Sequence, residues 1–406
     1  MQTKSKNRIL VISQNFYPEV FGINDIVRDL VERGFTVDVL TGLPNYPTGR
    51  FYEGYSFFKR GPKSYMGARL IRCGVFPRLK DSTIGICLNY ASFPLFAFFR
   101  IIPLLFKKYD KVFVYEPSPI FQCIPALIFG AVKRIEKIIY VLDIWPDSVY
   151  SVVDIRNKFF RRLLYKYCCH VYKKFDRVLV TSRGFIPLLE KQGVQKDRME
   201  YFPQWASGVF TGNAAGNHRR ESFGNTFNIV FAGNIGVPQG LNVVIRAALL
   251  CRDITKLRWI LVGDGDAADH LKEKITAGRL EDIVIMPGRK PLEEMPGYYD
   301  AAGALLVTLK NIPLFQSIVP AKVQSYMASG KPLVAALDGE AAELIRDSGC
   351  GLVGPAEDAA ALAANVRKLM SMNKKELDDM GLRGKEYADT YFNKHKLLDR
   401  LESILC

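Results

Sequence analysis

The chain has 406 residues, of which 49% are hydrophobic and 24% are charged. This composition excludes a disordered chain, and the length predicts two or three domains rather than one core. The net charge of +15 is uneven: residues 1–205 carry 32 Lys and Arg against 17 Asp and Glu, whereas residues 206–406 carry 24 of each. The basic first half indicates an anionic partner, with nucleic acid and anionic lipid as the two candidates.

The first half has the pattern of a doubly wound α/β domain. "NRILVISQNF" (7–16) is an apolar run typical of a buried parallel strand, and residues 23–34 follow with the apolar spacing of a helix. Residues 35–42 form the next strand, which completes a β-loop-α-loop-β unit. Further strands are expected at 111–117, 137–146 and 177–182.

Two segments of the first half are apolar and basic enough to contact a membrane. "ICLNYASFPLFAFFRIIPLLF" (86–106) has the length of a membrane span but contains two prolines and an arginine, so a buried or interfacial helix pair is the preferred interpretation and a single span the alternative. "RNKFFRRLLYKYCCHVYKKF" (156–175) combines apolar residues near four-residue spacing with basic residues on the other faces. It is interpreted either as a core helix with a solvated face or as a face held on anionic lipid.

A second set of strands and helices begins at residue 226 with "TFNIVFAG". We therefore expect two Rossmann-like domains facing a central cleft at the carboxyl ends of their strands, where ligands bind in such folds. The expected boundaries are an acceptor-binding, membrane-facing domain at 1–205, a linker at 206–225, a donor domain at 226–374 and a helical tail at 375–406. The C-terminal helix is expected to cross back to the first domain.

The turn "GNIGVPQG" (233–240) lies between an expected strand and an expected helix. Its glycines allow a close approach of the backbone, and the N–H groups of a helix start suit a phosphate, although glycines are common in any α/β turn. The turn matches neither G-x-G-x-x-G nor G-x-x-x-x-G-K-[ST], which disfavours a dinucleotide cofactor and a P-loop ATPase. Lys322, which precedes an expected helix, could neutralise the charge of a departing diphosphate.

The acidic and cysteine clusters do not indicate a metal. Asp264-Gly265-Asp266 imitates a D-x-D motif but follows "WILVG" as a turn at the end of a strand, and Cys168-Cys169-His170 has no second ligand pair at zinc spacing. We expect no metal and no cofactor. The eight cysteines form no C-x-x-C pair and no signal peptide precedes them, so a reduced, cytoplasmic setting is expected.

The chain resembles the family 4 glycosyltransferases, which have the GT-B fold, and within them the WbuB-like branch of bacterial surface-polysaccharide enzymes. In the second half the resemblance is carried by "FAGNIGVPQGL", "LRWILVGDGD", "MPGRKPLEEMPGYYDAAGALLVTL" and "IVPAKVQSYMASGKPLVAALDGEAAELI". In the first half it is carried by "TGLPNYPTGRFYEGY" (41–55) and "LDIWPDS" (142–148).

The resemblance implies retaining transfer of a sugar from a UDP-sugar, and it assigns residues to that reaction. Lys322 and Asp143 are the candidate catalytic residues, Lys322 at the phosphates and Asp143 at an acceptor hydroxyl; an Asp that only caps the next turn is the alternative for Asp143. The donor-binding candidates are Gly22, Gly233, Asn234, Gly236, Gln239, Met286, Gly288, Arg289 and Ser325. The acceptor-binding candidates are Asn45, Tyr46 and Trp145.

One departure from the family pattern bears on the donor site. The family usually has two glutamates eight positions apart, and Ser317 and Ser325 stand in those places here. Since the second glutamate normally contacts the ribose hydroxyls, its loss implies an altered donor geometry, a different donor or reduced activity.

Three functions follow from these observations. The first is a peripheral enzyme at the cytoplasmic face of the inner membrane that adds a sugar, an N-acetylated one being favoured, to a polyprenyl-diphosphate-linked glycan. The second is a sugar-nucleotide epimerase of the same fold, and the third is a non-catalytic scaffold that has kept the fold. Nucleic-acid binding is disfavoured, because the positive charge alternates with large apolar residues and no nucleic-acid-reading motif is present.

Overall fold

The computed structural model describes residues 6–78, 83–152, 157–206 and 224–406. The expected linker at 206–225 lies almost entirely outside the described residues. The chain forms two compact units. Unit 1 comprises residues 1–181, 185–202 and 398–406, and unit 2 comprises residues 182–184 and 203–397.

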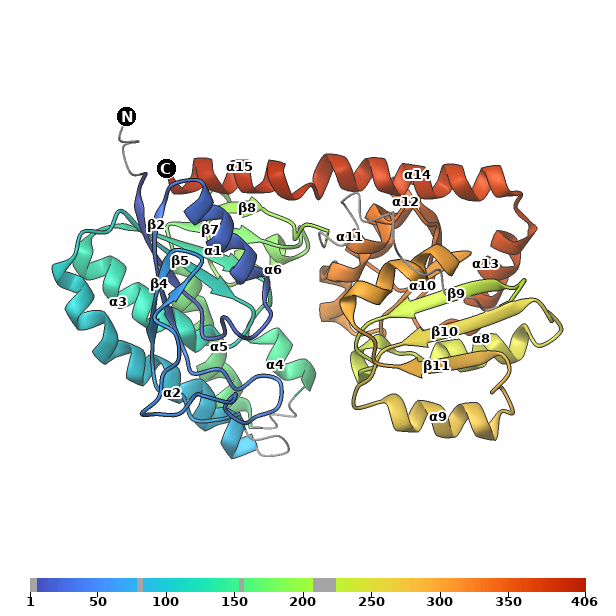
Figure 1. Ribbon diagram of the computed structural model, residues 1–406, viewed down its shortest axis with the longest axis horizontal. Coiled ribbons are helices and arrows are strands. Elements are labelled where there is room, and N and C mark those ends of the chain that lie inside the picture. Colours follow the sequence, from blue (N-terminus) through green and yellow to red (C-terminus); the bar gives the residue numbers. More distant parts are fainter. Residues whose placement is uncertain (1–5, 79–82, 153–156, 207–223) are drawn as a thin grey trace. The chain divides into compact units, whose positions relative to one another are not determined.

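Unit 1 contains an eight-stranded sheet in the order β3-β4-β2-β1-β5-β6-β7-β8, parallel except for the β3–β4 pair. Figure 1 shows these strands in blue to green. The strands are β1 Arg8–Ile12, β2 Thr36–Thr41, β3 Ser64–Tyr65, β4 Ala68–Arg72, β5 Lys111–Glu116, β6 Glu136–Val141, β7 Arg177–Val180 and β8 Met199–Tyr201. The helices are α1 Gly22–Glu32, α2 Thr83–Ile101, η1 Ile102–Phe106, η2 Ile120–Gln122, α3 Cys123–Lys133, α4 Asp147–Val152, α5 Lys158–Lys173, α6 Phe185–Lys191 and η3 Lys196–Arg198.

The sequence pattern of unit 1 explains its elements. In β1, Ile9 to Ile12 are all buried, as expected for a parallel strand covered on both faces. In α1, the buried residues Ile23, Ile26, Val27 and Leu30 recur every three or four positions. Gly34 follows the helix with a φ of 90°, a conformation that glycine adopts without strain.

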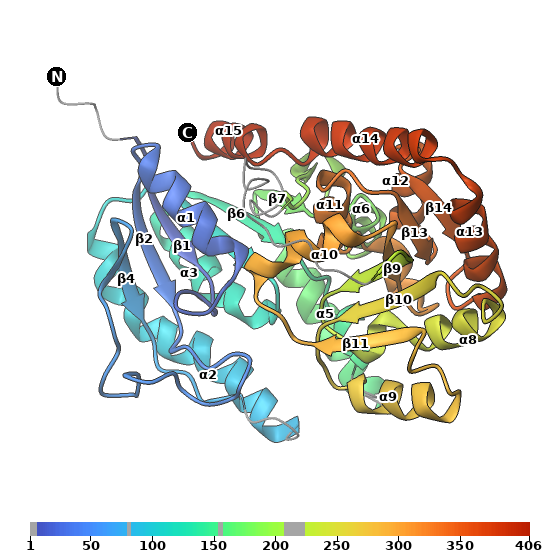
Figure 2. The same ribbon diagram turned by 45° about the vertical axis from the view of Figure 1, so that its right-hand side comes forward.

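Unit 2 contains a six-stranded sheet in the order β11-β10-β9-β12-β13-β14, in which neighbouring strands are parallel. Figure 2 shows β11, β10 and β9 running side by side. The strands are β9 Phe227–Ala232, β10 Leu257–Val262, β11 Val284–Gly288, β12 Ala304–Thr308, β13 Leu333–Ala336 and β14 Gly351–Gly354. The helices are η5 Val237–Gln239, α8 Asn242–Leu250, α9 Ala268–Ala277, η6 Leu292–Glu294, α10 Met295–Ala301, η7 Pro313–Ser317, α11 Ala321–Ala328, α12 Glu340–Asp347, α13 Ala359–Ser371, α14 Lys374–Tyr391 and α15 Lys394–Leu405.

Two apolar cores cover the sheet of unit 2. Alternate residues of β9 belong to different cores: Val230 and Ala232 lie in one, and Ile229 and Phe231 lie in the other. This alternation follows from the two-residue period of a strand, so the continuous apolar runs of the sequence supply both faces at once.

The last residues of the chain belong to unit 1, although α14 and the start of α15 belong to unit 2. The Asn7 side chain donates to the carbonyl oxygens of Leu405 and Cys406, each at 2.9 Å, and Lys111 Nζ donates to the carbonyl of Ile404 at 2.7 Å. A C-terminal helix that returns to the first domain is part of the expected fold class.

Candidate functional site

The turn after β9 is held in place by a second glycine turn after β10. The Gly233 N–H donates to the Val262 carbonyl at 3.0 Å, and Gly233 has a φ of 141°. A Cβ added at Gly263, whose φ is 147°, would lie 1.8 Å from the Gly233 carbonyl oxygen. The two turns are therefore packed backbone to backbone, and only glycine fits at this approach.

The structure corrects one expectation about this turn. Gly233 to Gly236 do not open an α-helix directly, because the three-residue 3-10 turn η5 comes first and α8 begins only at Asn242. Gly240 separates the two with a φ of 63°. A turn of three residues has little cumulative dipole, so the attraction of this loop for an anion depends on its side chains more than on a helix start.

Lys322 brings a positive charge to this turn from α11. Its Nζ donates to Gln239 Oε1 at 2.8 Å and lies 3.7 Å from the centre of the Phe231 ring. A Cβ on Gly233 would lie 3.3 Å from the same Nζ. Burial lowers the pKa of the Lys322 ammonium to about 7. Three of the predicted donor-site residues, Gly233, Gln239 and Lys322, are thus in one cluster.

Tyr326, which sequence reasoning did not select, fixes α11 to Ala232, the residue before the glycine turn. Its buried phenol accepts from the Ala232 N–H at 2.8 Å and donates to the Ala232 carbonyl at 3.0 Å. β12 pairs with β9 only as far as Val230, so the phenol replaces the missing strand partner of Ala232. Tyr326 is one helical turn after Lys322 on α11, and this spacing was the one signal available in the sequence.

The other predicted donor residues surround this cluster at the same strand ends. Asn234 is exposed, and its Nδ2 would lie 2.6 Å from a Cβ on Gly236, so that glycine leaves room for the Asn234 side chain. Gly288, at the end of β11, has a φ of 79°, and its carbonyl accepts from the Gly263 N–H at 3.0 Å.

Beside Gly288, Met286 packs against the core and Arg289 is exposed. Ser325 lies on α11 with its Oγ 3.5 Å from the Ala321 carbonyl, and Ser317 ends η7. Asp264, which was interpreted as part of a turn, has a carboxylate that accepts from the Gly265 N–H at 2.9 Å.

In unit 1 the predicted acceptor residues differ in how far water reaches them. Tyr46 is 41% exposed, whereas Asn45 and Trp145 are buried. The Asn45 amide donates to the Leu43 carbonyl at 2.9 Å and accepts from the Arg78 N–H at 3.0 Å. Trp145 donates from Nε1 to Ser118 Oγ at 3.1 Å. Gly22 is exposed and begins α1, where a Cβ would lie 3.0 Å from the Tyr115 hydroxyl.

Asp143 lies at the carboxyl end of β6 beside a second carboxyl group. Glu116 ends β5 and pairs in register with Val141, the last residue of β6, two residues before Asp143, and the two carboxyl groups are close enough to interact electrostatically. Burial raises the pKa of Asp143 to about 7. Glu116 is fully buried, and burial, with the neighbouring Asp143, raises its pKa well above the usual range. Neither Glu116 oxygen has a hydrogen-bond partner among the described residues.

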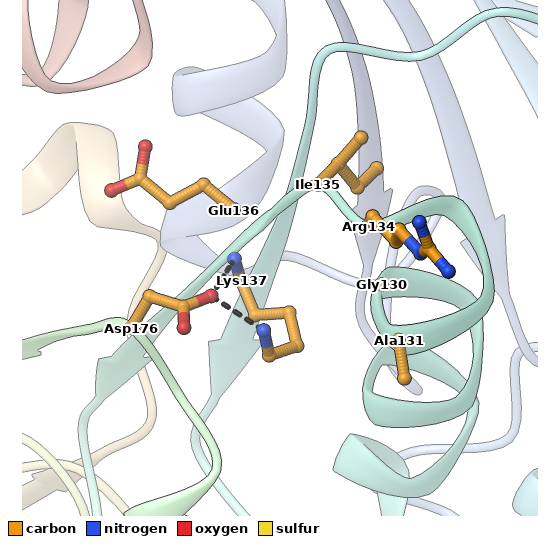
Figure 3. A pocket seen from close by; sticks show the side chains of 7 residues that line it. All are labelled: Gly130, Ala131, Arg134, Ile135, Glu136, Lys137 and Asp176. Carbon is orange, nitrogen blue, oxygen red and sulfur yellow. Dashed lines mark hydrogen bonds and ion pairs between the residues drawn. The ribbon is translucent and has the colours of Figure 1, made fainter.

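A hollow of about 430 Å³ lies at the opposite edge of the same sheet, where β6 begins (Figure 3). Arg134 and Glu136 line it together with Lys137, whose Nζ forms an ion pair with Asp176 at 2.5 Å. None of the predicted site residues lines this hollow. The predicted site residues belong to the carboxyl ends of the strands, whereas the hollow lies where β6 begins.

The two doubly wound units define the GT-B fold of glycosyltransferases. Solved structures agree: Alr3699/HepE from Anabaena, crystallised with UDP and glucose, has a TM-score of 0.69 with 16% identity, covering 98% of this chain and 99% of that one. At this identity the likeness concerns the fold. Residues 226–372 match the family described as "Glycosyl transferases group 1". Residues 226–372 are therefore similar to the group 1 glycosyltransferases.

Two relatives extend the similarity. A protein named as a colanic acid biosynthesis glycosyl transferase, WcaI of Escherichia coli K12, is 24% identical over 96% of this chain and 98% of its own length. The amylovoran biosynthesis glycosyltransferase AmsK of Erwinia amylovora is 30% identical over 46% of each chain. The resemblance to family 4 glycosyltransferases that the motifs indicate is thereby confirmed, whereas its WbuB-like branch stays a prediction.

Proposed function

We propose that the protein is a retaining glycosyltransferase that moves a sugar, an N-acetylated one by expectation, from a UDP-sugar to a polyprenyl-diphosphate-linked glycan during surface-polysaccharide assembly. The observation that carries this proposal is the cluster of Lys322, Gln239 and Gly233, which presents an ammonium beside a tight glycine turn. The names of the relatives WcaI and AmsK, which refer to colanic acid and amylovoran biosynthesis, support the pathway class.

The cluster suits the bond that must break. When the bond between the sugar C1 and the β-phosphate oxygen breaks, UDP leaves with the bonding electron pair and its negative charge increases. The Lys322 ammonium, held over the Phe231 ring, can offset that charge without a metal ion. A bound diphosphate would also raise the lowered pKa of Lys322, because an opposite charge favours the protonated form.

The acceptor hydroxyl forms the new bond to C1 on the face that UDP leaves, and its proton must be removed. Asp143 is the proposed partner of that hydroxyl, since a carboxyl group with a pKa of about 7 can accept and return a proton near neutral pH. In this proposal the nucleobase of UDP is held near Met286 and Gly288. Asn234, Gly236, Arg289 and Ser325 complete the donor site, and Gly22, Asn45, Tyr46 and Trp145 serve the donor sugar and the acceptor.

The experiment that tests the function is UDP release from a panel of UDP-sugars in the presence of a lipid-linked acceptor. Transfer by the native chain, lost in Lys322→Met and kept in Lys274→Met, would support the proposal. Lys274 is a matched control, because it lies in the same unit and also donates to a side-chain amide, Asn242 Oδ1, at 3.0 Å. Conversion of a UDP-sugar without an acceptor would favour the epimerase, and absence of UDP binding would favour a scaffold.

Unit 1 is also proposed to bind the inner membrane peripherally from the cytoplasmic side. In the described part of the chain, one helical stretch, Gly85–Phe106, is long and apolar enough to cross a bilayer. Its exposed apolar residues are Leu88, Leu95, Phe98, Phe99, Ile102 and Phe106, and α5 adds Phe159, Phe160 and Leu163. Lys107, Lys108, Arg161 and Arg162 lie beside them in sequence, which suits an anionic lipid surface.

Sedimentation with phosphatidylglycerol vesicles tests the membrane surface. Phe98→Ser with Phe99→Ser should reduce the bound fraction, because these two exposed rings would enter the interface. Leu249→Ser with Leu250→Ser is the matched control, since it removes an equally exposed adjacent pair from unit 2. Equal binding by both double variants and the native chain would contradict the proposed surface.

A further inference from the structure

Two buried charges of opposite sign lie between the loops that follow β1 and β2. Glu19 belongs to the first loop and is 3% exposed, and Arg72 ends β4 and is also 3% exposed. Neither residue was selected from the sequence. Charged side chains are rarely buried to this extent unless hydrogen bonds compensate for the lost hydration.

The hydrogen bonds of Glu19 connect the two loops through their N–H groups. Glu19 Oε1 accepts from the N–H groups of Asn45 and Tyr46, each at 2.7 Å, and Oε2 accepts from the Phe16 N–H at 3.2 Å. One carboxylate thus receives three backbone donors, two from the loop after β2 and one from its own loop.

Arg72 connects the same two loops through their carbonyl groups. It donates to the Tyr17 carbonyl in the first loop at 2.6 Å and to the Gly42 carbonyl in the second at 3.3 Å. The guanidinium also lies 5.2 Å from the centre of the Tyr55 ring. The carboxylate therefore accepts hydrogen bonds from backbone N–H groups of the two loops, and the guanidinium donates hydrogen bonds to their carbonyl groups.

We propose that Glu19 is a positioning residue for the acceptor subsite, holding the Asn45–Tyr46 turn against the loop that leads to Gly22. This proposal rests on the proposed function, in which Asn45 and Tyr46 serve the acceptor. Glu19 itself is too deeply buried to touch a substrate, so it acts through the backbone of those two residues. Tyr46, whose N–H it receives, is the exposed member of the turn.

The state of Glu19 should depend on pH near neutrality. Burial raises its pKa to about 7, against the opposing effect of the three N–H groups and of Arg72. A protonated carboxyl group gives up part of its accepting capacity, so the turn loosens as pH falls through this range. The groups that face Glu19 are the Arg72 guanidinium and the Tyr52 phenol, whose pKa is raised above 10, so neither titrates between pH 6 and 8.

The test is Glu19→Gln, assayed for the KM of each substrate from pH 6 to 8. The acceptor KM should rise about tenfold while the donor KM stays within twofold, since charge-assisted bonds to one turn are lost. In the native chain the acceptor KM should rise as pH falls, and in Glu19→Gln this dependence should be smaller, the remainder coming from Asp143, whose pKa is also about 7. If the native chain transfers sugar, an acceptor KM that is the same in Glu19→Gln as in the native chain would overturn the proposal.

Asp38→Asn is the matched control. Asp38 is another buried carboxylate of unit 1, but its hydrogen bonds come from Arg8 and Arg69, each at 2.8 Å, and from the Tyr109 hydroxyl, none of which belongs to either loop. It should lower the melting temperature without changing either KM. If Glu19→Gln does not fold, Arg72→Lys is assayed instead, and it should raise the acceptor KM a few-fold, because one ammonium cannot reach both carbonyl groups.

Hydrogen exchange separates this proposal from the proposed function. The amides of Asn45 and Tyr46 should exchange about tenfold faster in Glu19→Gln than in the native chain, and no faster in Asp38→Asn. If the native chain transfers no sugar, the function is wrong, and this exchange still decides whether Glu19 holds the turn. Unchanged exchange would overturn the positioning role whatever the enzyme does.

Discussion

At the carboxyl ends of its strands unit 2 carries the lysine Lys322, whereas unit 1 carries the carboxyl groups of Asp143 and Glu116 as well as the buried Arg72 guanidinium at the end of β4. Burial lowers the pKa of Lys322 to about 7 and raises the pKa of Asp143 to about 7. Burial therefore shifts the pKa of a base downward and the pKa of an acid upward, and both pKa values come close to neutral pH. One fold, used twice in a chain, can thus supply an anion site in one copy and a proton acceptor in the other.

The lysine is where the largest effect is expected. Lys322→Met should lower kcat/KM for the UDP-sugar by about 10³-fold, because a charge aimed at the leaving group is lost. Steady-state kinetics with the Lys274→Met control measures the difference. An equal loss of kcat/KM in Lys322→Met and Lys274→Met would mean that the effect is not specific to the Lys322 cluster.

Substitution of the Asp143 carboxyl group in unit 1 should have a smaller effect on activity, and this effect should depend on pH. Asp143→Asn should lower kcat by about 10²-fold, the usual contribution of one acid–base group. In the native chain kcat should fall as pH drops below about 7, where Asp143 becomes protonated. Asp147→Asn, four residues further on at the start of α4, provides the control. An Asp that only caps the turn would leave the pH profile of kcat unchanged.

Two glycines of unit 2, Gly263 and Gly288, differ in the atoms that an added methyl group would contact. Gly263→Ala should destabilise the fold by about 3 kcal/mol or more, since the new Cβ would lie 1.8 Å from a carbonyl oxygen. Gly288→Ala, also at positive φ but with nothing within 4 Å, should cost about 1–2 kcal/mol. Thermal unfolding of both variants measures the gap, and equal losses would contradict the tight approach of the two turns.

Per pH unit, the smallest predicted effect is a pair of opposite pH slopes in stability. The Lys322 pKa is lowered from 10.5 to about 7, so the unfolded chain holds more protons between these values and native stability rises with pH there. The Asp143 pKa is raised from 3.8 to about 7, so its contribution is present below pH 3.8 and is lost as pH rises through about 7.

Chemical denaturation measures these slopes against the matched variants. Stability of the native chain relative to Lys322→Met should increase by at most about 1.4 kcal/mol per pH unit above pH 7. Relative to Asp143→Asn it should decrease by at most a similar amount between pH 4 and 7. Slopes of the same sign would show that the two edges are electrostatically alike.

The sequence predicted the parallel sheets and part of the donor site because these depend on local patterns. Apolar runs identify buried strands, and glycines beside a strand end identify a turn of close approach, which selected Gly233 and Gly236. Gln239 was assigned through the resemblance to family 4 glycosyltransferases, and the structure places it beside Lys322. The 3-10 turn before α8 was missed because Gly240 ends it in a left-handed conformation, which a glycine-rich run does not specify.

The residues that sequence reasoning missed act through contacts distant in the chain. Tyr326 bonds a residue 94 positions earlier, and Glu19 bonds residues 26 and 27 positions later. Neither contact leaves a periodic signal. The burial of Glu116 is set by the elements that cover β5, and such burial is not visible in a single sequence.

The return of α15 to unit 1 has a consequence for dissecting the protein. A fragment that stops before residue 224 would lack the backbone carbonyl groups that Asn7 and Lys111 bond, together with the buried side chains of Leu398, Leu401 and Leu405. Expression of the first unit alone therefore requires residues 398–406, either co-expressed as a peptide or joined ahead of Asn7 in a circular permutant.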